Sequence, residues 1–392
     1  MPLFQDSLAV LSVLMLNIVI AEWLALQPYF RHLGTALIVI LLTAITSNIG
    51  LIPASVYPPP LYDGIFTYLA PISIFYLLLT VNLNGLKKAG KPMILCFFLG
   101  SLGTMLGVVI GMWIINGPKG FGEFYFALGG MFAGTYTGGS TNFNAVALHY
   151  QINKEGNLYA AATAVDNIIT AFWMVVTLLL PQLLQRYFPR KISLSQTDET
   201  IAHFEEEALR HVNDEETINP KDIAILIGIG VFGLFVSKQG SIWFPQIPPI
   251  ITLTTLALVL AQLPIVQRLR GMKVLAMFCI YLFLAVIGAY CDFAALLQDS
   301  TLAFNMMFFV SILVIVHGIV QFGIGGLFKQ DWAILAISSQ ANVGGSASAL
   351  ALSKSLSRPD LYLPGILVGA LGNAVGTYFG LFLAEYLRTI VW

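Results

Sequence analysis

The sequence predicts an all-α integral membrane protein made of two inverted repeats. Each repeat is expected to hold about five transmembrane helices and one re-entrant or broken helical segment. Hydrophobic residues make up 57% of the 392 residues and charged residues only 10%, whereas soluble domains carry about 25% charged residues. Apolar stretches long enough to span a bilayer recur along the chain. A glycine-rich polar motif occurs once in each half, which indicates a duplication.

Charge and cysteine content exclude several other classes of protein. The formal net charge is −1, and no basic cluster is interleaved with aromatic residues, so we expect membrane lipid and no nucleic acid among the partners. Three scattered cysteines are too few for a disulfide framework. No Lys or Arg precedes the first apolar stretch, which is unlike a cleaved signal peptide, so we expect this stretch to be retained.

Twelve apolar stretches follow one another, and most have about the 20 residues that a crossing helix needs. They lie near 8–26, 33–52, 65–83, 93–116, 123–150, 159–186, 221–238, 248–265, 272–290, 303–327, 332–353 and 362–387. A polar stretch with two acidic clusters separates the sixth from the seventh. We therefore expect a first membrane repeat at 1–186, a cytoplasmic acidic linker at 187–220 and a second repeat at 221–392.

Matching residues support the duplication. Gly138-Gly139-Ser140 recurs 206 residues later as Gly344-Gly345-Ser346, and the same offset relates Asn167 to Asn373. At an offset that is one residue shorter, Tyr76 also aligns with Tyr281. Each match is weak alone, but their shared order favours two copies of one unit.

The basic residues predict that the repeats are inverted. If all twelve stretches cross the membrane, the 19 Lys and Arg violate the positive-inside rule. If 123–150 and 332–353 instead return to the side from which they enter, only Lys119, Lys154, Lys238 and Arg388 fall outside. Each half then crosses five times, and an odd number inverts the second half, as in many secondary transporters. Broken crossing helices stay an alternative for both stretches.

The two motifs carry the residue types of a transport site. Glycines and hydroxyls break a helix, and broken backbone at membrane depth is tolerated where it is buried or lines a cavity. The helix ends that it creates can face an anion, while carbonyl, hydroxyl and amide oxygens can hold a cation. The candidate binding residues are Thr137, Gly138, Gly139, Ser140, Thr141, Asn142, Asn144, Asp166 and Asn167 in the first half, and Asn342, Gly344, Gly345, Ser346, Ser348 and Asn373 in the second. The alternative is that Gly130, Gly134 and Gly138 only allow helices to pack closely.

Asp166 lies well inside the sixth apolar stretch. A carboxylate at that depth costs about 2.5–3.5 kcal/mol to insert, which makes it a functional candidate. We expect no cofactor, with Na⁺ at Asp166 as a candidate coupling ion; a structural carboxylate is the alternative. His317 and Gln321, one helical turn apart, are secondary candidates, and the pattern favours an interhelical contact over a proton relay.

The segments 137–144 and 342–349, with Val165-Asp166-Asn167, resemble the YjcL-like family of uncharacterised membrane proteins (domain of unknown function 819). More distantly, the chain is similar to sodium/proton antiporters, bile-acid sodium symporters and sodium/glutamate symporters. That resemblance implies a core domain moving against a flatter panel domain, coupled to Na⁺ or H⁺. In the antiporters, two consecutive acidic residues often occupy the equivalent position. In this chain Asp166 is followed by Asn167 instead.

We therefore expect a non-enzymatic secondary active transporter that moves a small organic solute, an anion in preference, by alternating access. Its expected location is the plasma membrane, the inner membrane of a bacterium. A cation/proton antiporter without organic substrate is the alternative. A channel and an intramembrane hydrolase using Ser346 or Ser348 with His149 or His317 are less favoured, because no third group is evident to orient either histidine. The sequence leaves the solute and the oligomeric state open, a homodimer included.

Overall fold

A computed structural model describes residues 2–30, 33–54, 58–83, 85–190, 219–293, 300–390 and 392. All regular elements in these ranges are helical, as expected, and each of the twelve apolar stretches is covered by one to three consecutive helical elements. The ends differ most where polar residues such as Asp63 and Lys238 interrupt the apolar run without ending the helix. Most of the predicted linker, 191–218, lies outside the described residues.

The first half contains α1 (Ser7–Ala25), α2 (Gly34–Asn48), α3 (Pro60–Gly64), η1 (Ile65–Leu69), α4 (Ala70–Leu79), η2 (Leu86–Ala89), α5 (Lys91–Ile115), α6 (Gly117–Phe121), η3 (Gly122–Phe124), α7 (Tyr125–Gly138), α8 (Ser140–His149), η4 (Ile152–Lys154) and α9 (Gly156–Tyr187). The second half contains α11 (Pro220–Trp243), α12 (Pro249–Ala261), α13 (Pro264–Gln267), α14 (Met272–Ala289), α16 (Ser300–Gly318), η5 (Ile319–Ile324), α17 (Gly325–Leu327), α18 (Trp332–Ser355), η6 (Pro359–Leu361) and α19 (Tyr362–Thr389).

Eight helical segments of the described chain are long and apolar enough to cross a membrane. They are α1, α3 to α4, α5, α9, α11, α14, α16 to α17, and α19. Two further apolar helices, α2 and α12, are shorter than the ~20 residues of a full crossing. The apolar composition is thus concentrated in helices that are long enough to cross a membrane several times.

The two glycine-motif segments are helical hairpins. Gly139 (φ 107°) separates α7 from α8, and Gly345 (φ 73°) interrupts α18. A Cβ added at Gly134 would lie 3.2 Å from the Asn142 Cβ, and one added at Gly130 would lie 3.2 Å from Val146 Cγ1. This antiparallel pairing shows that α8 returns along α7.

The second motif folds back in the same way. A Cβ added at Gly365 of α19 would lie 2.9 Å from Ile337 and 3.4 Å from Ala349, which stand on opposite sides of the break at Gly345. In a straight helix these two residues would be about 18 Å apart along the axis. Between the two forms that the sequence left open, the structure therefore has hairpins rather than broken crossing helices.

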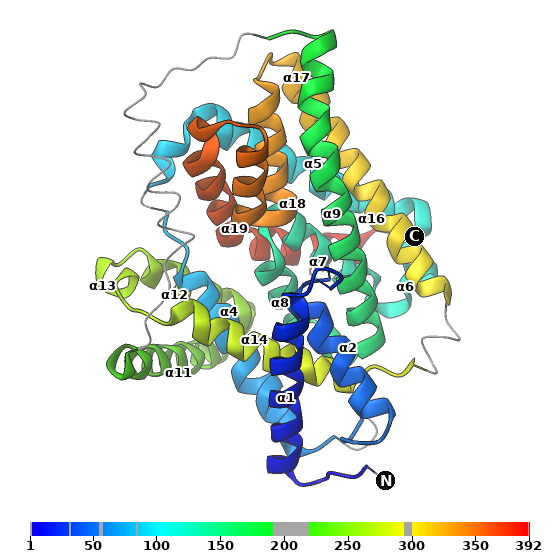
Figure 1. The fold of residues 1–392 in the computed structure, drawn as a ribbon, viewed down its shortest axis with the longest axis vertical. Helices are drawn as coiled ribbons and strands as arrows, with labels where there is room; N and C mark the ends of the chain where they lie inside the picture. The colour runs from blue at the N-terminus through cyan, green and yellow to red at the C-terminus, as the bar shows by residue number, and fades with distance from the viewer. Residues whose placement is uncertain are drawn as a thin grey trace.

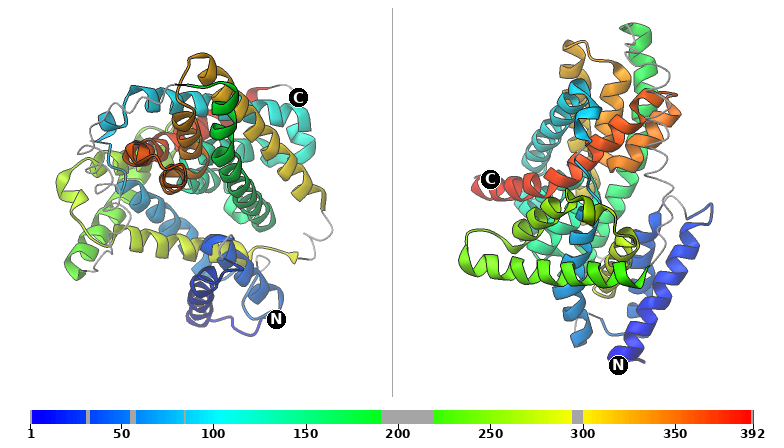
Figure 2. Two further views of the ribbon diagram at one scale, coloured as in Figure 1. Left: turned by 45° about the horizontal axis from the view of Figure 1, so that its top comes forward. Right: turned by 90° about the vertical axis from the view of Figure 1, so that its left-hand side faces the viewer.

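The helices form two groups, and each group takes members from both halves. In the first group, called the core, α5 packs on α16, α7 on α19, and α18 on α5, α7, α9 and α19. In the second, called the panel, α14 packs on α2 and α4, α1 on α2, and α12 on α4 and α11. Figure 1 shows α9 and α16 running lengthwise above, while α11 and α14 lie across the lower part. The side view in Figure 2 shows α11 at a large angle to α1.

Glycines bring the core helices close together. A Cβ at Gly107 of α5 would lie 2.6 Å from the Leu313 carbonyl oxygen of α16, and one at Gly130 would lie 2.6 Å from the Gly380 carbonyl oxygen of α19. The close-packing interpretation of Gly130, Gly134 and Gly138 therefore describes what these three glycines do. It does not account for the polar residues beside them.

Candidate functional site

The tips of the two hairpins meet inside the core. A Cβ added at Gly345 would lie 3.6 Å from the Gly138 carbonyl oxygen and 4.0 Å from the Gly139 Cα. The two chain breaks that the sequence places 206 residues apart are thus neighbours in space. Each break leaves the first N–H groups of the following half-helix without intrahelical partners.

Asn342 fixes the second hairpin to the core. In the orientation that satisfies both ends of its amide, it accepts from Ser101 Oγ of α5 at 2.9 Å and donates to the Ser338 and Phe97 carbonyl oxygens at 3.1 and 3.2 Å. The side chain is fully buried. Asn342 is therefore committed to holding the hairpin, and its side chain is not available to a ligand in this conformation.

Helix α19 lies across both tips. Gly372 packs so closely on Gly138 that a Cβ at Gly138 would overlap the Gly372 backbone, at 1.9 Å. Asn142 donates to the Gly372 carbonyl oxygen at 3.2 Å and accepts from Thr377 Oγ1 at 2.8 Å. Ser346 donates to the Ile366 carbonyl oxygen at 3.0 Å. These contacts use backbone and side-chain polar groups of the predicted site to assemble it.

A few of the predicted residues remain at the open side of the tips. Ser140 is exposed, and Gly139, Asn373, Gly344 and Ser348 are partly so. The Asn373 carboxamide oxygen would lie 3.6 Å from a Cβ at Gly139, so it stands directly beside the first break. This open side presents a hydroxyl, an amide and the start of a half-helix to a ligand.

Other predicted residues make structural contacts. Thr137 donates its hydroxyl to the Ala133 carbonyl oxygen within α7 at 2.8 Å. Asn167 donates to the Leu33 carbonyl oxygen at 3.1 Å and so joins α9 of the core to the start of α2 in the panel. Thr141 is buried within α8. The structure thus separates the candidate residues into those that build the site and those that face it.

Asp166 lies beside a residue that sequence reasoning did not select. Its Oδ1 and the hydroxyl of Tyr136 are both closed off from solvent, and neither makes a hydrogen bond of regular geometry in the described chain. The two groups lie next to each other, with Thr170 beside the Tyr136 hydroxyl. Burying unpaired polar atoms costs about 1–3 kcal/mol each, so this pair favours a bound cation or a proton.

Two more residues complete the surroundings of Asp166. The Tyr159 hydroxyl donates to Asn144 Oδ1 in a short contact and lies close enough to Asp166 to interact electrostatically. Tyr136 stood within the first motif, so its position beside the glycine break could have marked it. Tyr159 lies among apolar residues, and no pattern marked it in advance.

The oxygens around Asp166 suit one type of ion. One carboxylate with neighbouring hydroxyl groups fits a monovalent hard cation such as Na⁺, which takes oxygen ligands. In the part of the chain that the structure describes, no three His, Cys, Asp or Glu side chains gather to hold a metal ion. Asp166, Tyr136 and Thr170 are the residues that could hold such an ion.

His317 and Gln321 form interhelical contacts, the interpretation that the sequence favoured. His317 Nδ1 lies 2.9 Å from the Gly100 carbonyl oxygen, and Nε2 lies 2.8 Å from Ser339 Oγ. Since a carbonyl only accepts, Nδ1 carries the proton and Nε2 accepts from Ser339. Gln321 donates to the Leu335 carbonyl oxygen and to Ser338 Oγ at 2.9 and 2.7 Å. Both residues tie α16 and η5 to the second hairpin.

Comparison with known proteins places this architecture in a family. Residues 9–390 match a family model described as "Protein of unknown function (DUF819)". The chain is also 28% identical to the "Uncharacterized membrane protein YjcL" of Bacillus subtilis (strain 168), over 95% of this chain and 96% of that protein. The match includes both hairpins, Asp166 and the panel helices. The chain therefore belongs to the DUF819 family of membrane proteins.

Proposed function

We propose that the protein is a secondary active transporter in which Na⁺ or H⁺ at Asp166 drives the movement of a small organic anion. The observation that carries this proposal is the meeting of two hairpin tips beside a buried carboxylate oxygen that makes no hydrogen bond of regular geometry in the described chain. A tightly packed structural site would satisfy such an atom. A site that binds and releases an ion during each transport cycle needs a carboxylate oxygen that is free to coordinate the ion.

The hairpin tips supply a place for the solute. Helix α8 and the second part of α18 both start at a glycine break, and helix N-termini carry partial positive charge. Ser140 and Asn373 add polar side chains at the open side of the first tip. A carboxylate on a small solute is the chemical group that this combination favours.

The division into core and panel supports alternating access. Each group contains helices from both halves, and the contacts inside a group are more extensive than those between groups. Under the proposal, the core moves against the panel and exposes the tips to one side of the membrane at a time. The two halves are then inverted repeats, and the membrane is the plasma membrane of a bacterium.

Three alternatives make different demands on the site. A cation/proton antiporter would use Asp166 without an organic solute, and a channel would need a continuous polar path. A hydrolase would need a histidine beside its serine. In the structure Ser346 donates to the Ile366 carbonyl oxygen, while His317 pairs with Ser339, which argues against that use of Ser346.

Two measurements on the purified protein test the proposal. Melting temperatures across Na⁺, Li⁺, K⁺, pH and a panel of carboxylates should identify a stabilising ion and a stabilising anion. Proteoliposomes should then accumulate that anion only under a gradient of that ion. Ion-dependent proton exchange without anion uptake would support the antiporter, and single-channel current would support the channel.

A further inference from the structure

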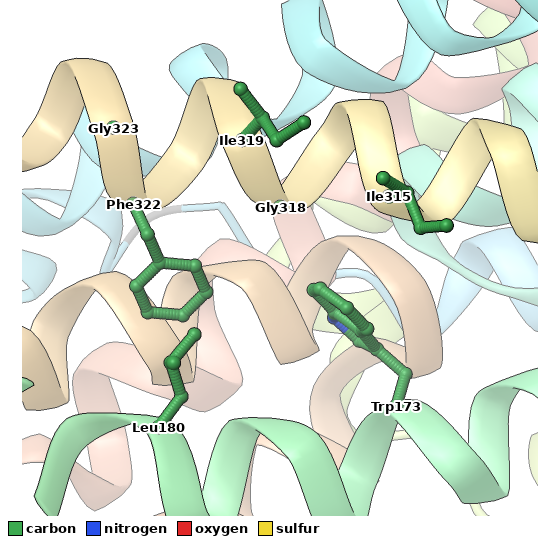
Figure 3. A pocket seen from close by; sticks show the side chains of 7 residues that line it. All are labelled: Trp173, Leu180, Ile315, Gly318, Ile319, Phe322 and Gly323. Atoms are coloured by element: carbon green, nitrogen blue, oxygen red, sulfur yellow. The ribbon is translucent and has the colours of Figure 1, made fainter. Parts of the chain in front are cut away.

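An apolar groove runs along the outer side of the core between α9 and α16. Trp173 and Leu180 extend from α9 toward Ile315, Ile319 and Phe322 on the opposite helix (Figure 3). Its volume is about 450 Å³, and its walls are almost entirely apolar. Gly323 leaves the floor of the groove open, since a Cβ there would meet nothing within 4 Å.

The groove continues along α9 to a cation. A second recess shares Leu180 with the first and ends at Arg186, in the last turn of α9. Arg186 is exposed and has no salt-bridge or hydrogen-bond partner among the described residues. Its neighbour Arg190 is already engaged, because it donates to the Gly326 carbonyl oxygen at 2.6 Å and lies over the Trp332 ring. One free guanidinium therefore lines the recess that adjoins the apolar groove.

We propose that this groove binds an anionic phospholipid, with an acyl chain along Leu180, Phe322 and Trp173 and the phosphate at Arg186. The stretch of α9 from Arg186 to Trp173 spans about 20 Å, and half of a bilayer, its headgroup region included, is about 20 Å thick. The groove thus starts at a cation and ends about one leaflet deep, which are the shape and the charge of such a lipid.

The charge and the side of the membrane favour a lipid with net negative charge. A guanidinium binds a phosphate through paired N–H groups. The charge-based topology places Arg186 at the cytoplasmic leaflet, where anionic lipids attract basic residues. A zwitterionic headgroup would carry its own cation beside the phosphate and would gain less from Arg186.

The bound lipid would touch a residue that holds the second hairpin. Trp173 forms part of the groove and donates its indole N–H to Ser339 Oγ at 3.0 Å, the same hydroxyl that faces His317. Trp173 also packs against Gly318, just before the π-helical turn η5. An acyl chain in the groove would therefore stabilise the contact between α9, α16 and the hairpin.

Lipid titration of the delipidated full-length protein tests this inference. Dioleoyl phosphatidylglycerol should raise the melting temperature more than dioleoyl phosphatidylcholine does. Arg186→Gln should weaken the apparent affinity for phosphatidylglycerol about fivefold. Gly323→Leu should abolish the difference between the two lipids, because the new side chain would occupy the groove.

Two matched variants serve as controls. Arg268→Gln removes an exposed arginine of the panel, and Gly228→Leu adds a side chain at an exposed glycine of α11 where a Cβ would also meet nothing within 4 Å. Both should keep the lipid preference. Equal stabilisation by the two lipids, reproduction of the effect by inorganic phosphate, or an unchanged preference in either groove variant would overturn the proposal. Because no transport is measured, these outcomes are independent of the proposed function.

Discussion

At the scale of single residues, the sequence identified polar groups but not their tasks. The sequence marks Asp166 because a carboxylate at membrane depth costs free energy to insert. In the described chain its Oδ1 makes no hydrogen bond of regular geometry. Asn142 and Asn342 were selected by the same logic, yet they hold hairpins through side-chain contacts. The sequence cannot separate an amide that binds a ligand from one that holds a hairpin, because both stand at the same positions of the motif. Only the packing of α5 and α19 decides which amides are already hydrogen-bonded within the protein.

The pair of Asp166 and Tyr136 makes a prediction at this scale. Asp166→Asn should insert normally and lose both the ion-induced rise in melting temperature and ion-driven uptake, since it removes charge without changing shape. Wild type should gain about 2.7 kcal/mol at a hundredfold excess of ion over Kd. Tyr136→Phe removes one hydroxyl and keeps the carboxylate, so the ion should still stabilise but at a higher concentration. Full ion-dependent stabilisation of Asp166→Asn would make this carboxylate structural.

At the scale of elements, hydropathy and the length of the apolar stretches predicted the helices well, whereas the hairpins required the count of basic residues in addition. A stretch such as 123–150 forms one long hydropathy run, because the motif around the return at Gly139 is polar but carries no charge. The basic residues favoured a return over a crossing, and the contact of Gly134 with Asn142 agrees with it. The close approach of Gly138 to Gly372 could not be predicted, since it depends on how α19 crosses a distant segment.

The two glycine breaks of the hairpins lead to a prediction about transport. Gly139→Val and Gly345→Val should abolish transport while leaving the protein inserted. Both glycines combine positive φ with ψ near 180°, a backbone region that essentially only glycine occupies and that costs other residues about 1–3 kcal/mol. A Cβ at Gly139 would have room, its nearest neighbour being Asn373 Oδ1 at 3.6 Å, so the effect would come from the backbone.

A glycine outside the breaks is the control for that experiment. Gly228 of α11 has φ outside the positive range and open space around it, so Gly228→Val should insert and transport as wild type does. If Gly139→Val and Gly345→Val also transported normally, the two motifs would be packing devices, and the solute would have to bind elsewhere.

At the scale of the whole molecule, a duplication of one unit would explain why the core and the panel each contain helices from both halves. The two sequence repeats place a positive-φ glycine at matching positions, Gly139 and Gly345, and the structure brings these positions together. The inverted orientation itself rests on the count of basic residues and stays a prediction. It matters for mechanism because two inverted halves can exchange conformations, which makes inward-open and outward-open states similar in energy.

Matching loops of the two halves test the inversion directly. Tyr29, between α1 and α2, is 91% exposed, and Gln246, between α11 and α12, is also exposed. The three native cysteines are buried, so background labelling should be low. In intact cells an impermeant thiol reagent should label Gln246→Cys and leave Tyr29→Cys and Ser195→Cys, in the acidic linker, unlabelled; permeabilised cells should label all three. Labelling of Tyr29→Cys and Gln246→Cys from the same side would instead make the repeats parallel, and the odd number of crossings per half would then be wrong.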